Sequence, residues 1–254
     1  MKALPLSGRQ TEIMSDAIPS ARQVPFAFDL TRSTSREDYV PGLANDAALA
    51  FIDAWPNWRA RVGAIWGPRG SGKSHLSQIW RMAAHAIEIT PSALTIERVT
   101  ELSPGCAVLV DGAGDVTTGA PLFHLINFIN NSQSWLLLTG EQAPQRWPTS
   151  VPDLHSRLTA VTGACLDLPD EALMARVLLK LFGDRQLKFP EALIDYLVPR
   201  LRRSFADAEK LVALMDYLAL EKKRSVSIET AARALRQLDD ERNGLSADNP
   251  DAMG

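Results

Sequence analysis

Cysteine, long hydrophobic runs and an excess of positive charge are all scarce in this chain of 254 residues. The two cysteines, Cys106 and Cys165, lie in apolar stretches, so we expect small buried side chains in a reducing compartment rather than disulfides. No apolar run approaches the ~20 residues that span a bilayer. The N-terminal stretch also lacks the apolar core of a secretion signal. Together these absences predict a cytoplasmic protein with no membrane partner.

The charge balance argues against a dedicated nucleic-acid-binding protein, and the histidines argue against a metal site. The net charge is −3, whereas a chain whose main task is holding nucleic acid is usually basic. Any contact with DNA is therefore expected to be local or made through a partner. The four histidines show none of the spacings typical of a metal site. No Ser/His/Asp or Cys/His arrangement of a catalytic nucleophile stands out either.

Composition and patterning divide the chain into four parts. With 46% apolar and 22% charged residues, it has the composition of a globular protein. Residues 1–22 are polar and aperiodic, and residues 1–34 form the predicted flexible arm, which includes an apolar stretch at 23–28. Residues 35–169 form the predicted core domain, and residues 170–238 a smaller helical domain, which we call the lid. Residues 239–254 are polar and acidic, and we expect a flexible tail.

The core predicts an α/β fold with a five-stranded parallel sheet. Short continuous apolar runs alternate with helical stretches, as in a sheet that helices cover on both faces. The five expected strands are 62–66, 86–89, 107–110, 135–138 and 164–168. Ligands bind such sheets beyond the carboxyl ends of the strands, and Gly67, Asp111 and Thr139 fall at such ends.

From residue 170 onward the strand signals stop, and apolar residues recur with helical periodicity. The four expected helices of the lid are 171–182, 191–202, 207–221 and 228–238. The sequence therefore predicts an α/β core followed by a small all-helical domain.

One segment of the core carries a phosphate-binding pattern. Residues 67–74 fit G-x-x-x-x-G-K-[ST] at every position, after an apolar run and before a helical pattern. The residues are Gly67, Pro68, Arg69, Gly70, Ser71, Gly72, Lys73 and Ser74. Glycines let the backbone wrap a polyphosphate, and the N–H groups at the helix start point at it. Lys73 would reach the outer phosphates, and Ser74 would ligate Mg²⁺. A chance turn is the disfavoured alternative, because both flanking conditions are met.

Three further residues are candidates whose roles the residues alone leave open. Asp111 ends a strand beside the loop, where a carboxylate that holds Mg²⁺ belongs; it could also be a solvated turn residue. The next residue is Gly112 rather than a second acid that would orient an attacking water. Thr139 could sense a γ-phosphate or satisfy a turn. Composition alone would make Arg157 a solvated arginine.

Taken together, these motifs resemble the DnaA-related branch of the AAA+ ATPases, and within it the Hda-like proteins. Four segments carry the resemblance: 38–45, 67–76, 138–144 and 152–158. The resemblance implies an adenine-side box containing Tyr39, Val40 and Asn45, and places His75 directly after the phosphate loop. It also implies that Thr139 is the first sensor. Arg157 would be an arginine finger that acts in trans on a neighbour's nucleotide.

The apolar stretch 23–28 extends the resemblance into the arm. Hda-like proteins carry a short motif here that docks on the DNA-polymerase sliding clamp. Gln23, Val24, Phe26 and Phe28 match its layout of one polar residue followed by apolar anchors. The alternative is that the two phenylalanines pack on the chain's own core.

The resemblance implies a negative regulator of DNA replication initiation. It would bind ADP or ATP with Mg²⁺, dock on the sliding clamp, meet DNA only through the clamp, and stimulate ATP hydrolysis by DnaA. Its own ATPase is expected to be weak, and homodimerisation is left open. The lid departs from the family, because Phe205-Ala206-Asp207 stands where AAA+ lids usually place an arginine.

Two other readings stay open. One is a stand-alone AAA+ ATPase, such as a helicase loader or a divergent DnaA-like initiator core. The other is a scaffold on the clamp that merely holds a nucleotide.

Overall fold

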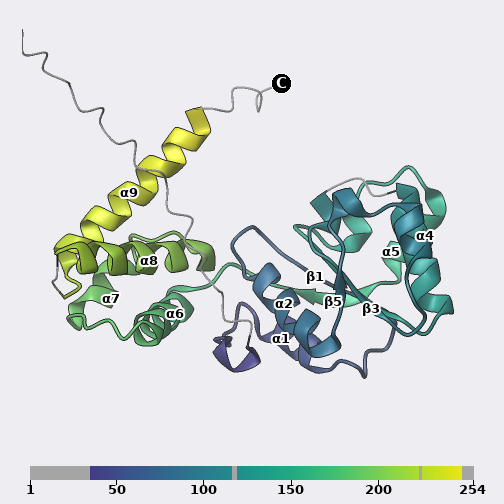
Figure 1. Cartoon of the computed structure of the whole chain (residues 1–254), viewed down its shortest axis with the longest axis horizontal. Coiled ribbons are helices and arrows are strands. Elements are labelled where there is room, and N and C mark those ends of the chain that lie inside the picture. The colour runs from purple at the N-terminus through teal and green to yellow at the C-terminus, as the bar shows by residue number, and fades with distance from the viewer. Residues whose placement is uncertain (1–34, 116–118, 223–224, 248–254) are drawn as a thin grey trace, which may run out of the picture. The chain divides into compact units, whose positions relative to one another are not determined.

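The computed structural model describes residues 35–115, 119–222 and 225–247 (Figure 1). The whole predicted arm, residues 1–34, with its motif at residues 23–28, lies outside the described residues, as do residues 248–254. No helix in the described part of the chain is long and apolar enough to cross a membrane.

The core contains the predicted five-stranded sheet. The strand order is β2-β3-β4-β1-β5, and every neighbouring pair is parallel. The strands are β1 (Val62–Trp66), β2 (Ile87–Glu88), β3 (Ala107–Val110), β4 (Trp135–Gly140) and β5 (Thr162–Cys165). The α/β prediction is therefore confirmed. The carboxyl ends of β1, β3 and β4 lie side by side, which gathers the predicted site residues at one edge of the sheet.

The fifth strand differs from its prediction. The sequence places it at residues 164–168, but the structure pairs Thr162 to Cys165 with β1. β5 is an edge strand whose residues alternate between half-buried and exposed, so it lacks the continuous apolar run that marks an inner strand. For the same reason Cys165 is exposed rather than buried, and Cys106, just before β3, is half-buried. The expectation of two buried cysteines is wrong.

Helices cover both faces of the sheet, and side chains alternate between the two faces along each strand. Leu109 and Leu137 face the cluster built with α1 (Asp46–Asp53) and α2 (Lys73–Ala84). The adjacent residues of β3 and β4 face a second hydrophobic cluster on the opposite side of the sheet; they are Val108, Val110, Leu136 and Leu138. That cluster contains residues of α3 (Ile96–Thr100), α4 (Gly119–Asn131) and α5 (Pro152–Thr159).

Aromatic rings pack under β1 at its amino end. The Trp58 ring stacks on Phe51 and on Trp80, with centroid distances of 4.6 and 5.6 Å. The Trp58 indole N–H also donates to the Phe51 carbonyl at 2.7 Å. A side chain at Gly63 would meet the rings of Phe51 and Trp58, so the strand carries glycine there. The buried Trp58 and Trp80 therefore anchor this part of the core.

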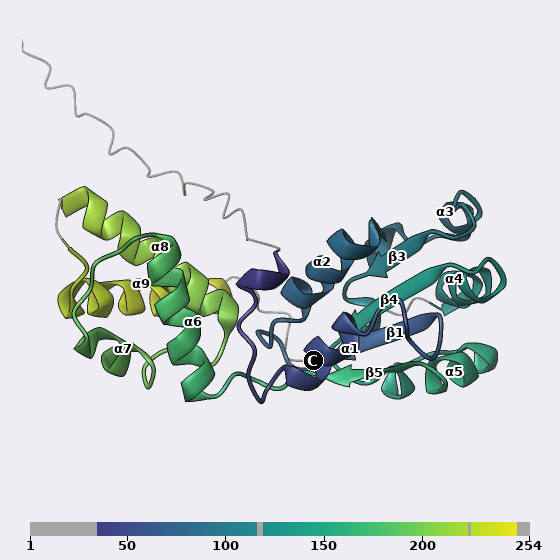
Figure 2. The same ribbon diagram turned by 90° about the horizontal axis from the view of Figure 1, so that it is seen from below.

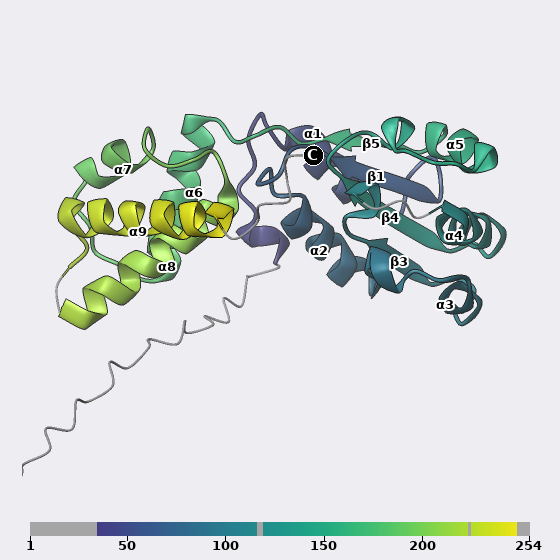
Figure 3. The ribbon, with the colours of Figure 1, turned by 90° about the horizontal axis from the view of Figure 1, so that it is seen from above.

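The lid is a bundle of four helices with its own hydrophobic core (Figures 2 and 3). They are α6 (Glu171–Asp184), α7 (Ala192–Leu197), α8 (Phe205–Lys222) and α9 (Ile228–Ala247). α7 is shorter than its predicted range of 191–202, because Pro199 cannot donate the next helical hydrogen bond. α8 begins two residues earlier than predicted, since the Ser204 hydroxyl caps it by accepting from the Asp207 N–H.

The last helix also runs further than expected. A flexible tail is predicted from residue 239, but α9 continues to Ala247 (Figure 1). Arg242, one turn beyond the buried Leu238, forms an ion pair with Asp207 of α8 at 2.6 Å. This ion pair gives the part of α9 beyond residue 238 a tertiary contact, which the helical periodicity of the sequence does not predict.

The tryptophan cluster makes the core sensitive to one substitution. Trp58→Ala removes two stacked contacts and leaves a cavity, so we expect about 3–5 kcal/mol of destabilisation. Chemical denaturation followed by circular dichroism measures it. Leu43→Ala is the control: Leu43 is 88% exposed, and we expect its loss to change stability by less than about 0.5 kcal/mol. Equal effects of the two substitutions would contradict the packing described here.

Candidate functional site

The phosphate loop follows β1 and ends at the first turn of α2. Gly67, Gly70 and Gly72 have φ values of +151°, +82° and +94°, which residues other than glycine rarely adopt. A Cβ at Gly67 would lie 2.0 Å from the Leu166 carbonyl oxygen. The glycines are thus required by both backbone conformation and close approach, as the sequence pattern predicts.

The polar groups of this loop fit a polyphosphate. The Lys73 ammonium donates to the carbonyls of Gly67 and Pro68 at 2.7 and 2.9 Å, so it sits against the loop. The Ser71 hydroxyl is fully buried and has no hydrogen-bond partner within the described residues. Ser74 is exposed in the first turn of α2. An anion bound there would meet a cation, a buried hydroxyl and the N–H groups of a helix start.

Asp111 and Thr139 meet at the ends of adjacent strands. The Thr139 hydroxyl donates to the Asp111 carboxylate and accepts from the Gly112 N–H, the latter at 2.7 Å. Thr139 is fully buried, whereas Asp111 is half-buried. Thr139 thus makes the hydrogen bonds expected of a strand-end hydroxyl, to the turn after β3 and to the carboxylate that would hold Mg²⁺, and its role as a sensor stays a prediction.

Gly112 itself has φ +79°. An acidic side chain at this position would be strained, and the backbone N–H is already engaged by Thr139. The turn is therefore built for glycine, and the position directly after Asp111 does not offer a carboxylate to orient water.

The segment 39–45 packs beside the phosphate loop. Asn45 is fully buried and braces this segment: its Oδ1 accepts from the Gly42 N–H at 2.8 Å, and its Nδ2 donates to the Val40 carbonyl at 3.1 Å. The Tyr39 ring lies edge-on to His75, with centroids 5.4 Å apart. Burial raises the pKa of the Tyr39 phenol, so it stays neutral. Asn45 thus fixes the backbone conformation of residues 40–42 through these two hydrogen bonds.

Residues 36–41, which overlap this segment, contact both the core and the lid. The 3-10 helix η1 (Arg36–Asp38) pairs with α1 through Arg36 and Asp53 at 2.7 Å. It pairs with α6 through Asp38 and Lys180 at 2.9 Å. Arg176 of α6 donates to the Pro41 carbonyl at 2.6 Å. The predicted adenine-side box is therefore held by residues on either side of the core–lid boundary.

The lid also touches the phosphate loop directly. The Phe205 N–H donates to the Gly70 carbonyl at 3.2 Å. A Cβ at Gly72 would lie 3.0 Å from the Phe205 ring, and one at Gly70 would lie 2.8 Å from the Ser204 hydroxyl. An aromatic ring, rather than an arginine, therefore stands against the loop. The sequence places Phe205 in this part of the lid but carries no signal for its contact with the loop.

A second contact that the sequence does not predict joins the loop to β4. The Arg69 guanidinium pairs with the Glu141 carboxylate, just beyond the end of β4. This hydrogen bond lowers the pKa of Glu141. Both side chains are exposed, so the pair is screened by water and contributes little to stability.

Arg157 lies far from its own phosphate loop. It is exposed in the last turn of α5, whose buried Leu154 and Leu158 anchor the helix to the core. α5 ends at Thr159 and leads back to the amino end of β5, opposite the edge that carries the phosphate loop (Figures 2 and 3). Within the described part of the chain, its guanidinium takes part in no hydrogen bond or salt bridge. It is thus available to another molecule.

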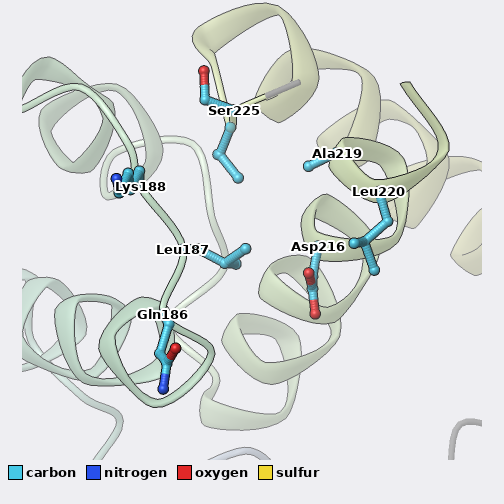
Figure 4. Close-up of a pocket in the computed structure, with 8 residues that line it drawn as sticks. Gln186, Leu187, Lys188, Asp216, Ala219, Leu220 and Ser225 are labelled. Carbon is cyan, nitrogen blue, oxygen red and sulfur yellow. The ribbon is translucent and has the colours of Figure 1, made fainter. Parts of the chain in front are cut away.

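Other features of the described residues do not add to this site. Nowhere in the described ranges do three or more His, Cys, Asp or Glu side chains gather as a metal site. A pocket of about 370 Å³ lies in the lid, between the loop after α6 and the end of α8 (Figure 4). Leu187, Ala219 and Val226 contribute its apolar lining, and none of the predicted site residues contributes to it.

Comparisons with known proteins place this geometry in a fold. No family model matches the sequence. An uncharacterized protein of Haemophilus influenzae is 25% identical over 177 residues, which cover 65% of this chain and 77% of that protein.

Solved structures are more informative. Domain III of the replication initiation protein DnaA from Thermotoga maritima matches with TM-score 0.71 and 18% identity, over 80% of this chain and 96% of that one. AMPPCP-bound DnaA from Aquifex aeolicus matches with TM-score 0.63 and 19% identity, over 82% and 70% of the two chains. The Thermotoga maritima RuvB Holliday junction branch migration motor matches with TM-score 0.61 and 16% identity, over 82% and 72%. The chain therefore has the AAA+ fold.

The Thr139–Asp111 contact gives the site a testable feature. Thr139→Val keeps the shape but removes the hydroxyl that orients the carboxylate, so we expect Mg²⁺-dependent nucleotide affinity to fall about tenfold. Titration of a fluorescent ADP with and without Mg²⁺ measures this. Thr139→Ser, which keeps the hydroxyl, is the control and should behave like the wild type. Undiminished Mg²⁺ dependence in Thr139→Val would show that Thr139 does not position Asp111 for the ion.

Proposed function

We propose that this protein is a nucleotide-binding AAA+ regulator of DNA replication initiation. In this role it stimulates ATP hydrolysis by DnaA through Arg157 while it is docked on the sliding clamp. The observation that carries the proposal is the separation of two functional parts on opposite edges of one sheet. The phosphate loop lies at one edge, and an exposed, uncommitted arginine lies at the other.

The first step is retention of ADP or ATP by the chain itself. The backbone N–H groups of the phosphate loop and Lys73 bind the phosphates, and the Ser71 hydroxyl gains the partner that burial denies it. Ser74 and Asp111 hold Mg²⁺, which neutralises phosphate charge when bound. The segment from Tyr39 to Asn45 lines the adenine side. AMPPCP bound to the Aquifex DnaA of the same fold supports this step.

The second step is the choice between holding the nucleotide and hydrolysing it. Gly112 occupies a left-handed turn with its N–H engaged, so no carboxylate stands directly after Asp111. No residue at that position can orient an attacking water, and the chain's own turnover is therefore slow. The protein serves as an activator rather than as an independent ATPase.

The third step takes place at the partner. An arginine donated in trans stabilises charge on a transferring phosphoryl group and accelerates hydrolysis by about 10³–10⁵. Arg157 extends from the last turn of a helix that two buried leucines anchor, so the side chain is presented on a rigid support. The structural likeness to DnaA supports DnaA as the partner, because subunits of one fold can assemble edge to edge.

Docking on the sliding clamp supplies the location. Gln23, Val24, Phe26 and Phe28 form a short peptide with one hydrogen-bonding residue and apolar anchors, suited to a greasy pocket on a partner. Through the clamp, an acidic protein works beside DNA in the cytoplasm without binding DNA itself.

The likeness to the RuvB motor favours a second assignment, a stand-alone AAA+ ATPase such as a helicase loader.

The arginine finger is tested by Arg157→Ala. We expect DnaA ATP hydrolysis, measured with clamp and DNA present, to lose stimulation by about 10³-fold or more, while folding and clamp binding are kept. Arg146→Ala, which removes another exposed arginine, is the matched control and should stimulate normally. Stimulation that survives in Arg157→Ala excludes the finger role. Rapid hydrolysis by the wild-type chain alone would favour the stand-alone ATPase.

The clamp motif is tested separately by Gln23→Ala and Phe26→Ala. Loss of a hydrogen-bonding or anchoring side chain from a short motif should weaken clamp binding about tenfold or more in surface plasmon resonance. Gln10→Ala, in the same N-terminal segment, is the control. Wild-type affinity in both motif variants would assign the clamp contact to another segment or remove it from the function.

A further inference from the structure

The start of α8 is the part of the lid that rests on the phosphate loop. Phe205 contacts this loop twice, through its N–H on the Gly70 carbonyl and through its ring against Gly72. Ser204 lies against Gly70 and caps the helix by accepting from the Asp207 N–H. Residues 204–207 therefore form one hydrogen-bonded turn. Whatever fixes Asp207 also fixes the aromatic ring on the loop.

Asp207 is fixed by α9. Its Oδ2 lies 2.6 Å from Arg242 Nη2, an ion pair whose side chains are only 17% and 25% exposed. No other salt bridge found among the described residues is as well shielded on both sides. Arg242 is also held by Asp239, whose Oδ1 accepts from Nη1 at 3.1 Å. Because water screens this pair less than a surface pair, its loss costs more.

Arg242 continues the packed face of its helix. The buried residues of α9 that precede it are Ala231, Ala234 and Leu238, at the helical spacing of three and four. Arg242 comes four residues after Leu238 on the same stripe. The stripe thus changes from apolar packing to a charged contact where it reaches the first turn of α8.

The pair also sets the charge of the Asp207 side chain in the turn that carries Phe205. An unpaired carboxylate in the turn that carries Phe205 would repel a polyphosphate held by Gly70, Gly72 and Lys73. Arg242 neutralises that carboxylate and holds the turn in place. Arg203, directly before this turn, pairs with Glu171 of α6 at 3.3 Å, and Arg242 of α9 is the cation that pairs with Asp207.

We propose that Arg242 is a positioning residue for the resident nucleoside diphosphate. Acting through Asp207, it holds Phe205 on the phosphate loop and removes a repelling charge from the lid side of the site. The C-terminal helix thereby controls how long the nucleotide stays bound. This inference rests on the proposed nucleotide site, but it does not depend on DnaA or on the clamp.

The test is the dissociation rate of a fluorescent ADP from the full chain with Mg²⁺, measured by stopped flow after mixing with excess unlabelled ADP. Arg242→Ala should release the nucleotide about tenfold faster than the wild type. Arg236→Ala removes an exposed arginine of the same helix and is the matched control, with an unchanged rate. The double variant Asp207→Asn/Arg242→Ala should recover to within about threefold of the wild type, because the unpaired carboxylate is gone.

The double variant separates neutralisation of the Asp207 charge from general support of the helix. If Arg242 only stabilised α9, removing Asp207 as well would rescue nothing, so a double variant as fast as Arg242→Ala overturns the proposal. A wild-type rate in Arg242→Ala also overturns it. A wild-type chain that binds no ADP overturns both this inference and the proposed nucleotide site. Failure to stimulate DnaA, in contrast, leaves the dissociation rates as predicted and counts only against the function of Arg157.

Discussion

The close approach of three chain segments at the phosphate loop is the constraint on which the rest of the structure depends. Gly67 admits the backbone at Leu166, beyond β5, while Gly70 and Gly72 admit the first turn of α8. Each approach requires the absence of a side chain. Because the loop connects β1 to α2, the same glycines join the sheet, the helix α2 and the lid.

The sequence predicts the inner strands, the phosphate loop and Asp111, because each depends on residues that are close together in the chain. Continuous apolar runs predict β1, β3 and β4, because these inner strands are buried on both faces. The loop from Gly67 to Ser74 is recognisable because its glycines and lysine act through backbone geometry within one turn. Asp111 is recognisable because a polar residue ends a buried strand, and its expected neighbour Thr139 does lie beside it.

The parts that escape prediction rest on pairs of residues far apart in the chain. Arg69 meets Glu141 across 72 positions, and Arg242 meets Asp207 across two helices. Neither pair has a local signal, because each residue alone is an ordinary charged side chain. β5 escapes for a different reason: as an edge strand it is only half-buried, so its residues do not form an apolar run.

A nucleotide that is held but seldom hydrolysed acts by favouring one arrangement of the protein. A ligand shifts a conformational equilibrium only by its difference in affinity for the two states. In this chain, we infer that this difference would arise where the lid touches the phosphate loop, because Phe205 contacts Gly70 and Gly72 there. The nucleotide would thus hold the lid to the core, and the core would present Arg157 from its opposite edge. The chemistry of hydrolysis would then belong to the partner, and the stability of the arrangement to this chain.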